Sequence, residues 1–126
     1  MSRILSFRDL DVWNKAVDLV VHAYDLTRAF PTEELYGLTS QIRRAAVSIP
    51  SNIAEGNGRM SRREYAHHVS IARGSVSELQ TCLEIARRLG YIGAEAARQI
   101  VERADKVSRM LLMLLRALNR TARSPI

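Results

Sequence analysis

The chain has 126 residues, a length that suits one domain and is short for two. Hydrophobic residues make up 47% of it and charged residues 25%, which excludes a disordered tail, a collagen-like repeat and a disulfide-rich scaffold. The net charge of +6 suits a polyanionic partner, although proteins without such a partner can be equally basic. The single cysteine, Cys82, rules out an internal disulfide and fits a reducing compartment. We therefore expect one basic domain that spans residues 1–126.

The first two helices are predicted at about residues 7–29 and 37–55, because apolar residues recur there at helical spacing. The core-facing side of the first helix is predicted at five apolar positions spaced three and four apart: Leu10, Trp13, Val17, Val20 and Tyr24. In the second helix, Pro50 removes a backbone donor and clashes with the carbonyl four residues earlier. We therefore expect a kink or a break in the second helix at Pro50.

The third and fourth helices are predicted at about residues 61–89 and 94–120. Ser61 followed by Glu64 has the spacing of a reciprocal capping box, which marks the start of the third helix. No stretch of the chain alternates as a half-buried strand would. Four amphipathic helices with short connections predict an all-α fold, an antiparallel up-and-down four-helix bundle.

The first and fourth helices carry more apolar surface than one core-facing stripe requires. The apolar arc of the first helix spans roughly 220°, whereas a stripe of about 100° is usual. In the fourth helix, Arg116 is the one polar residue between Met110 and Leu118. We expect the excess to be buried between subunits of a homo-oligomer, and a wide internal core is the alternative. The candidate interface residues are Val12, Ala16, Leu19, Ala23, Leu26, Met110 and Met113.

Basic residues form two candidate sites for phosphate groups. At 100° per residue, four arginines of the fourth helix fall within about 40° of one another: Arg98, Arg109, Arg116 and Arg120. Lys106 flanks this stripe, and Arg123 extends it if the helix continues. The loop before the third helix carries a second cluster, Arg59, Arg62 and Arg63. Arginines in such groups can neutralise phosphates without reading bases, and the alternative is a solvated face paired in part with acidic neighbours.

Few residues could carry catalysis or bind a metal ion. Glu64 and His67 have the Glu-x-x-His spacing of a diiron bundle, but neither His22 nor His68 has a glutamate three positions upstream. A lone cysteine such as Cys82 more often packs in a core than acts as a nucleophile. We therefore expect no catalytic, metal or cofactor site, and no enzyme.

Polar residues share one face of the second helix: Gln41, Ser48, Asn52 and Glu55. They could form a ligand-binding face. The favoured interpretation is a polar seam that satisfies backbone groups freed by Pro50, because buried backbone groups need hydrogen-bond partners.

The run AAVSIPSNIAEGNGR, residues 45–59, resembles the signature of the four-helix-bundle family of proteins encoded in intervening sequences of bacterial 23S ribosomal RNA genes. That family includes the accessory variability protein of diversity-generating retroelements. Other matching features are Leu10-x-Val12-Trp13, Phe30-Pro31, and Ile71-Ala72-Arg73-Gly74-Ser75 followed by Glu78-Leu79. The resemblance implies an up-and-down bundle that assembles into a ring-like homopentamer. It also implies association with nucleic acid or a reverse transcriptase in some members, and no established catalytic residues.

Two functions are compatible with these observations. One is a basic homo-oligomer, a pentamer by the resemblance, that binds RNA or DNA through backbone phosphates. The other is a protein-interaction scaffold whose charges keep it in solution. The longest apolar run, residues 110–115, is far too short for a membrane span, and the first six residues lack the apolar stretch of a signal peptide. We therefore expect a cytoplasmic protein with no membrane contact.

Overall fold

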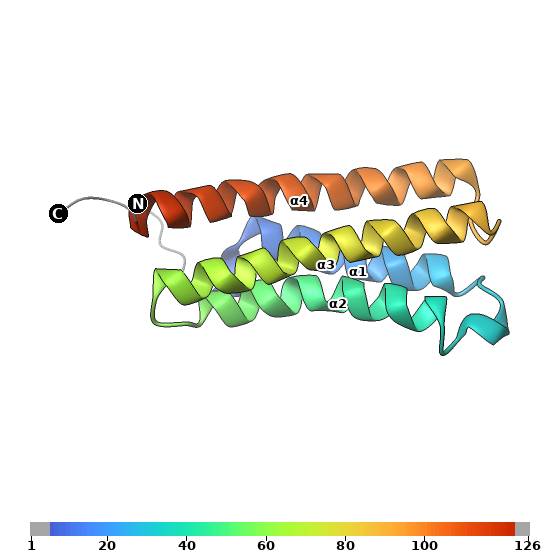
Figure 1. Cartoon of the computed structure of the whole chain (residues 1–126), viewed down its shortest axis with the longest axis horizontal. Helices are drawn as coiled ribbons and strands as arrows, with labels where there is room; N and C mark the ends of the chain where they lie inside the picture. Colours follow the sequence, from blue (N-terminus) through green and yellow to red (C-terminus); the bar gives the residue numbers. More distant parts are fainter. Residues whose placement is uncertain (1–5, 123–126) are drawn as a thin grey trace.

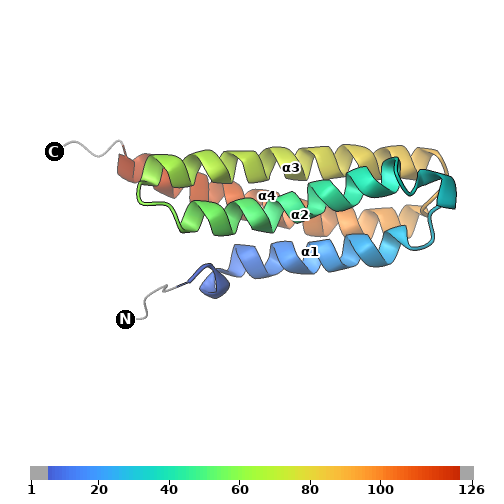
Figure 2. The same cartoon turned by 90° about the horizontal axis from the view of Figure 1, so that it is seen from below.

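The computed structural model describes residues 6–122, which form four long helices and two short 3-10 turns. The turns are η1 (Phe7–Asp9) and η2 (Thr32–Glu34), and the helices are α1 (Asp11–Thr27), α2 (Leu38–Asn57), α3 (Arg62–Arg88) and α4 (Ala94–Ala122). The helices lie along one axis, each antiparallel to the next in the chain (Figures 1 and 2). α2 packs on α3, α3 packs on α4, and α1 closes the bundle against α2 and α4. The predicted four-helix bundle is confirmed.

Local sequence signals set both ends of α3. The Ser61 hydroxyl oxygen accepts a hydrogen bond from the backbone N–H of Glu64 at 3.1 Å, as the predicted capping box requires. Glu64 does not return this bond, because its carboxylate turns to Arg59 at 3.8 Å. At the other end, Gly90 has a φ of 80°, a left-handed conformation that glycine adopts without penalty. This residue lets the chain leave α3 and enter α4 within a few residues.

The second helix continues without a break through Pro50, which is buried. The expected break is therefore wrong, and a bend without a break stays a prediction. Only one helical hydrogen bond is lost at the proline, and packing of α2 along α3 holds the helix on both sides of it. Near the end of α2, a Cβ atom on Gly56 would lie 2.8 Å from the Cβ atom of His68. Glycine at this position allows α2 and α3 to approach closely beside their connecting loop.

The side of α1 that faces the core is not the one expected. Val12, Ala16, Leu19 and Ala23 are between 0% and 6% exposed and pack against buried residues of the other helices. The prediction that these four residues form a subunit interface is therefore wrong. Small side chains at positions 16 and 23 let α1 approach its neighbours closely. The residues expected in the core of α1 lie at its margin, half-buried or exposed: Leu10, Trp13, Val17, Val20 and Tyr24.

A wide internal core also accounts for most of the apolar surface of α4. Leu111 and Leu118 are buried, and Met110 is half-buried against the core. Leu26 of α1 is likewise half-buried against the core, so neither Leu26 nor Met110 supports the predicted interface. Met113 alone among the candidate interface residues is well exposed, at 70%. Within residues 6–122, no helix combines the length and the hydropathy that crossing a membrane requires.

Candidate nucleic-acid interface

The basic stripe of α4 is divided by ion pairs. Arg98 donates to the Glu95 carboxylate at 3.0 Å and also pairs with Glu102. The hydrogen bond with Glu95 is the main reason why the pKa of Arg98 is raised and, reciprocally, that of Glu95 is lowered. The charge of Arg98 is therefore already compensated by carboxylates, and this residue drops out of the candidate site.

The C-terminal half of the stripe is different. Three exposed arginines form no hydrogen bond or ion pair with the described residues: Arg109, Arg116 and Arg120. Lys106 lies between two grooves, one that it lines with Arg109 and acidic residues of α4 and one that it lines with Asp18 of α1. Arg123 lies outside the described residues. The part of the stripe that offers free guanidinium groups is thus its last three turns.

The second basic cluster, in the loop before α3, also contains both paired and unpaired arginines. Arg59 lies between two carboxylates, 3.6 Å from Glu55 and 3.8 Å from Glu64, which compensate its charge. Arg62 and Arg63, in the first turn of α3, are exposed and form no ion pair with the residues that the structure describes. These two arginines can therefore meet an external anion without first breaking an ion pair.

The fold brings the unpaired arginines of α3 and those of α4 into the same half of the bundle. Gln80 donates to Asp105 at 2.6 Å, and this contact shows that these two residues lie at the same level of the antiparallel helices α3 and α4. Arg62 lies 18 residues before Gln80, and Arg120 lies 15 residues after Asp105. At 1.5 Å rise per residue, both arginines are therefore close to the same level along the bundle axis. Figure 1 shows the start of α3 and the end of α4 at one end of the molecule.

We name this end the basic end and define its free cations as Arg62, Arg63, Arg109, Arg116 and Arg120. The half of the bundle that contains them comprises residues 6–16, 50–74 and 108–122, with nine basic and four acidic residues. The other half comprises residues 17–49 and 75–107, with eight basic and nine acidic residues. The two halves carry similar numbers of basic residues, but nine against four gives the first half a net charge of +5, whereas eight against nine gives the other half −1.

Arginines of the other half are largely paired. Arg28 lies 2.9 Å from Asp25, and both Arg87 and Arg88 lie 2.8 Å from Glu84. The hydrogen bonds from Arg87 and then Arg88 lower the pKa of Glu84 to about 2. Exposed pairs of this kind contribute little to stability, but they reduce the field that a phosphate would meet. The contrast between paired and free arginines distinguishes the two ends.

The polar face of α2 forms a seam with α3. Ser48 and Ser75 hydroxyl oxygens lie 2.8 Å apart, and Asn52 Oδ1 lies 3.1 Å from Nδ1 of His68. The interpretation as a polar seam agrees with these contacts. Its proposed purpose is wrong, because the Asn52 amide donates to the Ser48 carbonyl at 2.9 Å, whereas Pro50 frees the carbonyl of Ala46.

The side chains considered for catalysis are dispersed. Burial, with a smaller contribution from Glu78, raises the pKa of the Cys82 thiol, which disfavours the nucleophilic thiolate. The thiol lies 3.7 Å from Gln41 Oε1, and His68 is engaged with Asn52. Across residues 6–122, no three His, Cys, Asp or Glu side chains are grouped so that they could hold a metal ion.

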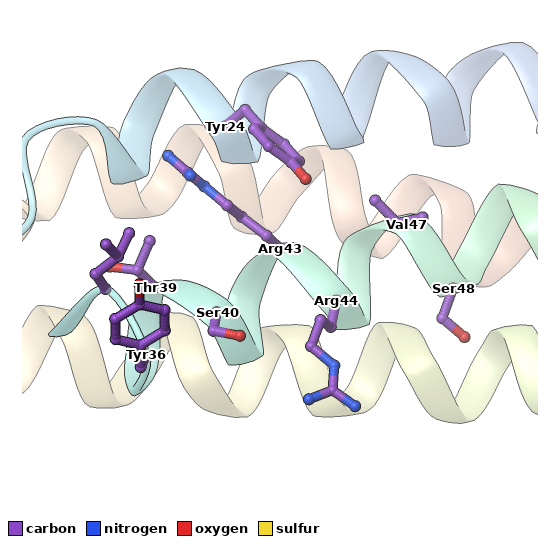
Figure 3. Close-up of a pocket in the computed structure, with 9 residues that line it drawn as sticks. Tyr24, Tyr36, Thr39, Ser40, Arg43, Arg44, Val47 and Ser48 are labelled. Carbon is purple, nitrogen blue, oxygen red and sulfur yellow. The ribbon is translucent and has the colours of Figure 1, made fainter.

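A groove of about 630 Å³ lies between α1 and α2, away from the basic end. Arg43 crosses it, donating through Nε to the Thr27 hydroxyl at 2.9 Å and placing its guanidinium 4.5 Å from the ring centre of Tyr24 (Figure 3). Tyr36 stands at the rim and is 93% exposed. Helical periodicity does not predict this groove, because it places Tyr24 in the core.

Met60 was also missed. It is 99% exposed in the loop between α2 and α3, next to the free arginines of α3. The signal available in the sequence was an apolar residue within the run Arg59-Met60-Ser61-Arg62-Arg63, a segment read only for its charges.

The comparisons with known proteins agree with the fold. A solved structure from Bacteroides thetaiotaomicron VPI-5482, a protein of unknown function from the S23 ribosomal protein family, superposes with a TM-score of 0.75. It is 23% identical, and the match covers 82% of this chain and 97% of that one, so it supports the fold alone. A comparison with curated proteins gives no match. The model of the 23S rRNA-intervening sequence protein family matches residues 8–113, and the chain therefore belongs to this family.

Proposed function

We propose that this protein is a non-catalytic nucleic-acid-binding protein that contacts backbone phosphates through its basic end. One observation carries the proposal: five arginines without carboxylate partners among the described residues lie in one half of the bundle, whereas the other half pairs most of its arginines. A guanidinium group that is free of a carboxylate can bind a phosphate with two parallel hydrogen bonds. Membership of a family named for its place within 23S rRNA genes is consistent with such a ligand.

The same surface offers little for reading single-stranded bases. The aromatic side chains of this half are engaged within the protein: Phe7 and Trp13 contact each other with ring centres 5.1 Å apart, and the Tyr65 hydroxyl accepts a hydrogen bond from Asn57 at 3.3 Å. Proteins that bind single strands usually present free aromatic rings on which bases stack. We therefore propose recognition of the backbone, with RNA and DNA distinguished only by the test below.

A salt titration tests this function. Binding to generic double-stranded and single-stranded RNA and DNA should weaken linearly in log–log form as salt rises, with a slope of about −0.9 for each phosphate contacted on a duplex. If each of the five free arginines contacts one phosphate, the same relation gives a slope of roughly −4 to −5 per subunit, and fewer contacts give a shallower slope. Indifference to all four nucleic acids at low salt would contradict the proposal and favour the protein-interaction scaffold.

We further propose that the protein is a homo-oligomer that associates through its α1–α2 face, which we define as Tyr24, Leu35, Tyr36 and Val47. These four line one groove and are among the ten large apolar side chains that are exposed among the described residues. Exposed apolar patches of this kind on a small domain commonly mark a protein contact. The family resemblance makes a pentamer the expected number of subunits.

Association would also strengthen nucleic-acid binding, because each subunit adds one basic end and several weak phosphate contacts act together. Multi-angle light scattering at micromolar concentration should give a mass of about five times 14.2 kDa, following the ring-like assembly that the resemblance implies. A mass of 14.2 kDa throughout the concentration range would contradict self-association.

A further inference from the structure

Met60 is the most exposed large apolar residue that the structure describes, at 99%. It lies in the tight loop that joins α2 to α3 at the basic end, where the chain reverses direction (Figure 2). The loop holds its shape through its own backbone: Gly58 N–H donates to the Ala54 carbonyl at 3.2 Å, and Arg59 N–H donates to the Gly56 carbonyl at 3.0 Å. Nothing in residues 6–122 covers the thioether side chain.

Two further contacts link the loop to the helices on either side of it. The guanidinium of Arg59 lies 3.6 Å from Glu55 on α2 and 3.8 Å from Glu64 on α3, so it bridges the two helices. Ser61 then caps α3 through its bond from the Glu64 N–H. Because the backbone of this loop is already ordered, binding at Met60 would cost little further backbone conformational entropy.

The surroundings of Met60 distinguish it from other exposed apolar residues. Arg62 and Arg63 follow within three residues and are free of carboxylate partners in the described part of the chain. At the opposite end of the bundle, Leu89 is also exposed, at 55%, but the preceding arginines are paired with Glu84. An exposed apolar residue beside unpaired arginines therefore occurs in the α2–α3 loop and not in the α3–α4 loop.

We propose that Met60 inserts between stacked base pairs of a double-stranded nucleic acid while Arg62 and Arg63 bind the flanking phosphates. Apolar side chains, methionine among them, act as wedges of this kind in proteins that kink duplexes, with basic residues on either side. The inference rests on the proposed function and narrows its ligand to a duplex. Flexible pyrimidine–purine steps such as TA cost least to unstack and are the preferred positions for insertion.

A duplex carrying 2-aminopurine at a central TA step tests the insertion, since unstacking raises the fluorescence of this base. The wild-type protein should increase the fluorescence by about twofold or more at saturation. Met60→Gln, which keeps the length of the side chain but makes it polar, should abolish the increase and weaken binding by roughly threefold to tenfold. Met60→Leu should retain most of the increase, and Leu89→Gln, the matched change at the opposite loop, should leave both readouts unchanged.

The outcomes separate this inference from the function on which it rests. Duplex binding with unchanged 2-aminopurine fluorescence, or an equal increase with Met60→Gln, would overturn the insertion and leave phosphate binding standing. Absence of binding to any duplex at low salt would overturn both. The last measurement uses vesicles of phosphatidylserine and phosphatidylcholine. If the wild-type protein binds these vesicles, Met60→Gln does not, and no duplex is unstacked, the loop contacts an anionic lipid surface instead of a nucleic acid.

Discussion

Leu19→Asp is expected to unfold the protein, whereas Val47→Asp, at an exposed position of α2, is expected to leave it folded. Leu19 is 0% exposed in the centre of the core, and Val47 is 40% exposed on the α1–α2 face. An unpaired carboxylate in an apolar core costs roughly 4–5 kcal/mol or more, which approaches the whole stability of a domain of this size. The same charge at an exposed position usually changes stability by about 0.5 kcal/mol or less.

Circular dichroism and chemical unfolding measure whether each variant folds, and light scattering measures its mass in solution. Leu19→Asp should lose its helical signal or its cooperative transition. Val47→Asp should keep a wild-type transition while its mass falls toward that of a monomer. A folded but dissociated Leu19→Asp protein would contradict the assignment of this residue to the internal core. An unfolded Val47→Asp protein would show that the exposed α1–α2 face belongs to the core instead.

Helix positions could be predicted well from the sequence because local signals determine them. The third helix was expected at 61–89 and is observed at Arg62–Arg88, with Ser61 and Gly90 acting as its start and stop signals. Pro50 was misleading in one respect. The steric rule for proline describes an isolated helix, and a helix packed along a neighbour tolerates the loss of one hydrogen bond without ending.

The orientation of α1 could not be predicted from periodicity. Its apolar arc is so wide that two different stripes satisfy the helical spacing, and the spacing alone does not show which stripe faces the core. In the folded protein the stripe with alanines at positions 16 and 23 faces the core, because small residues allow close contact between helices. Trp13 and Tyr24 then lie at the margin, where a large ring can be partly buried and its polar atom can stay near water.

The candidate site was predicted in part. Helical spacing along one helix was enough to align Arg109, Arg116 and Arg120, because that arrangement depends on a single element. The spacing could not show that Arg98 is engaged by Glu95 and Glu102, since side-chain conformations decide which neighbours pair. Nor could it show that the start of α3 meets the end of α4, because this proximity depends on helix register in three dimensions.

The triple variant Arg62→Gln, Arg116→Gln and Arg120→Gln should bind nucleic acid far more weakly than the wild type. It removes three free cations from the basic end and touches no hydrogen bond or ion pair among the described residues. The loss should be roughly tenfold to a hundredfold at moderate salt and similar for every sequence, because phosphate contacts carry no base information. The slope of log affinity against log salt should become shallower by about 2.7 if each arginine contacts one duplex phosphate.

A matched variant controls for the change in net charge. Arg28→Gln, Arg87→Gln and Arg88→Gln together also remove three positive charges, but these arginines lie in the other half of the bundle and are paired with Asp25 and Glu84. Both triple variants alter exposed residues, so circular dichroism and light scattering should show wild-type folding and wild-type mass for each. Any difference in binding between them then reports where the nucleic acid lies.

The affinity of these two variants for one generic duplex, measured side by side across a salt series, is the most direct test that the basic end binds nucleic acid. We predict that the variant at Arg62, Arg116 and Arg120 loses affinity and salt dependence, while the variant at Arg28, Arg87 and Arg88 stays close to the wild type. Equal losses in both variants would show that net charge alone governs binding. Wild-type affinity and slope in the first variant would contradict the assignment of the site to the basic end.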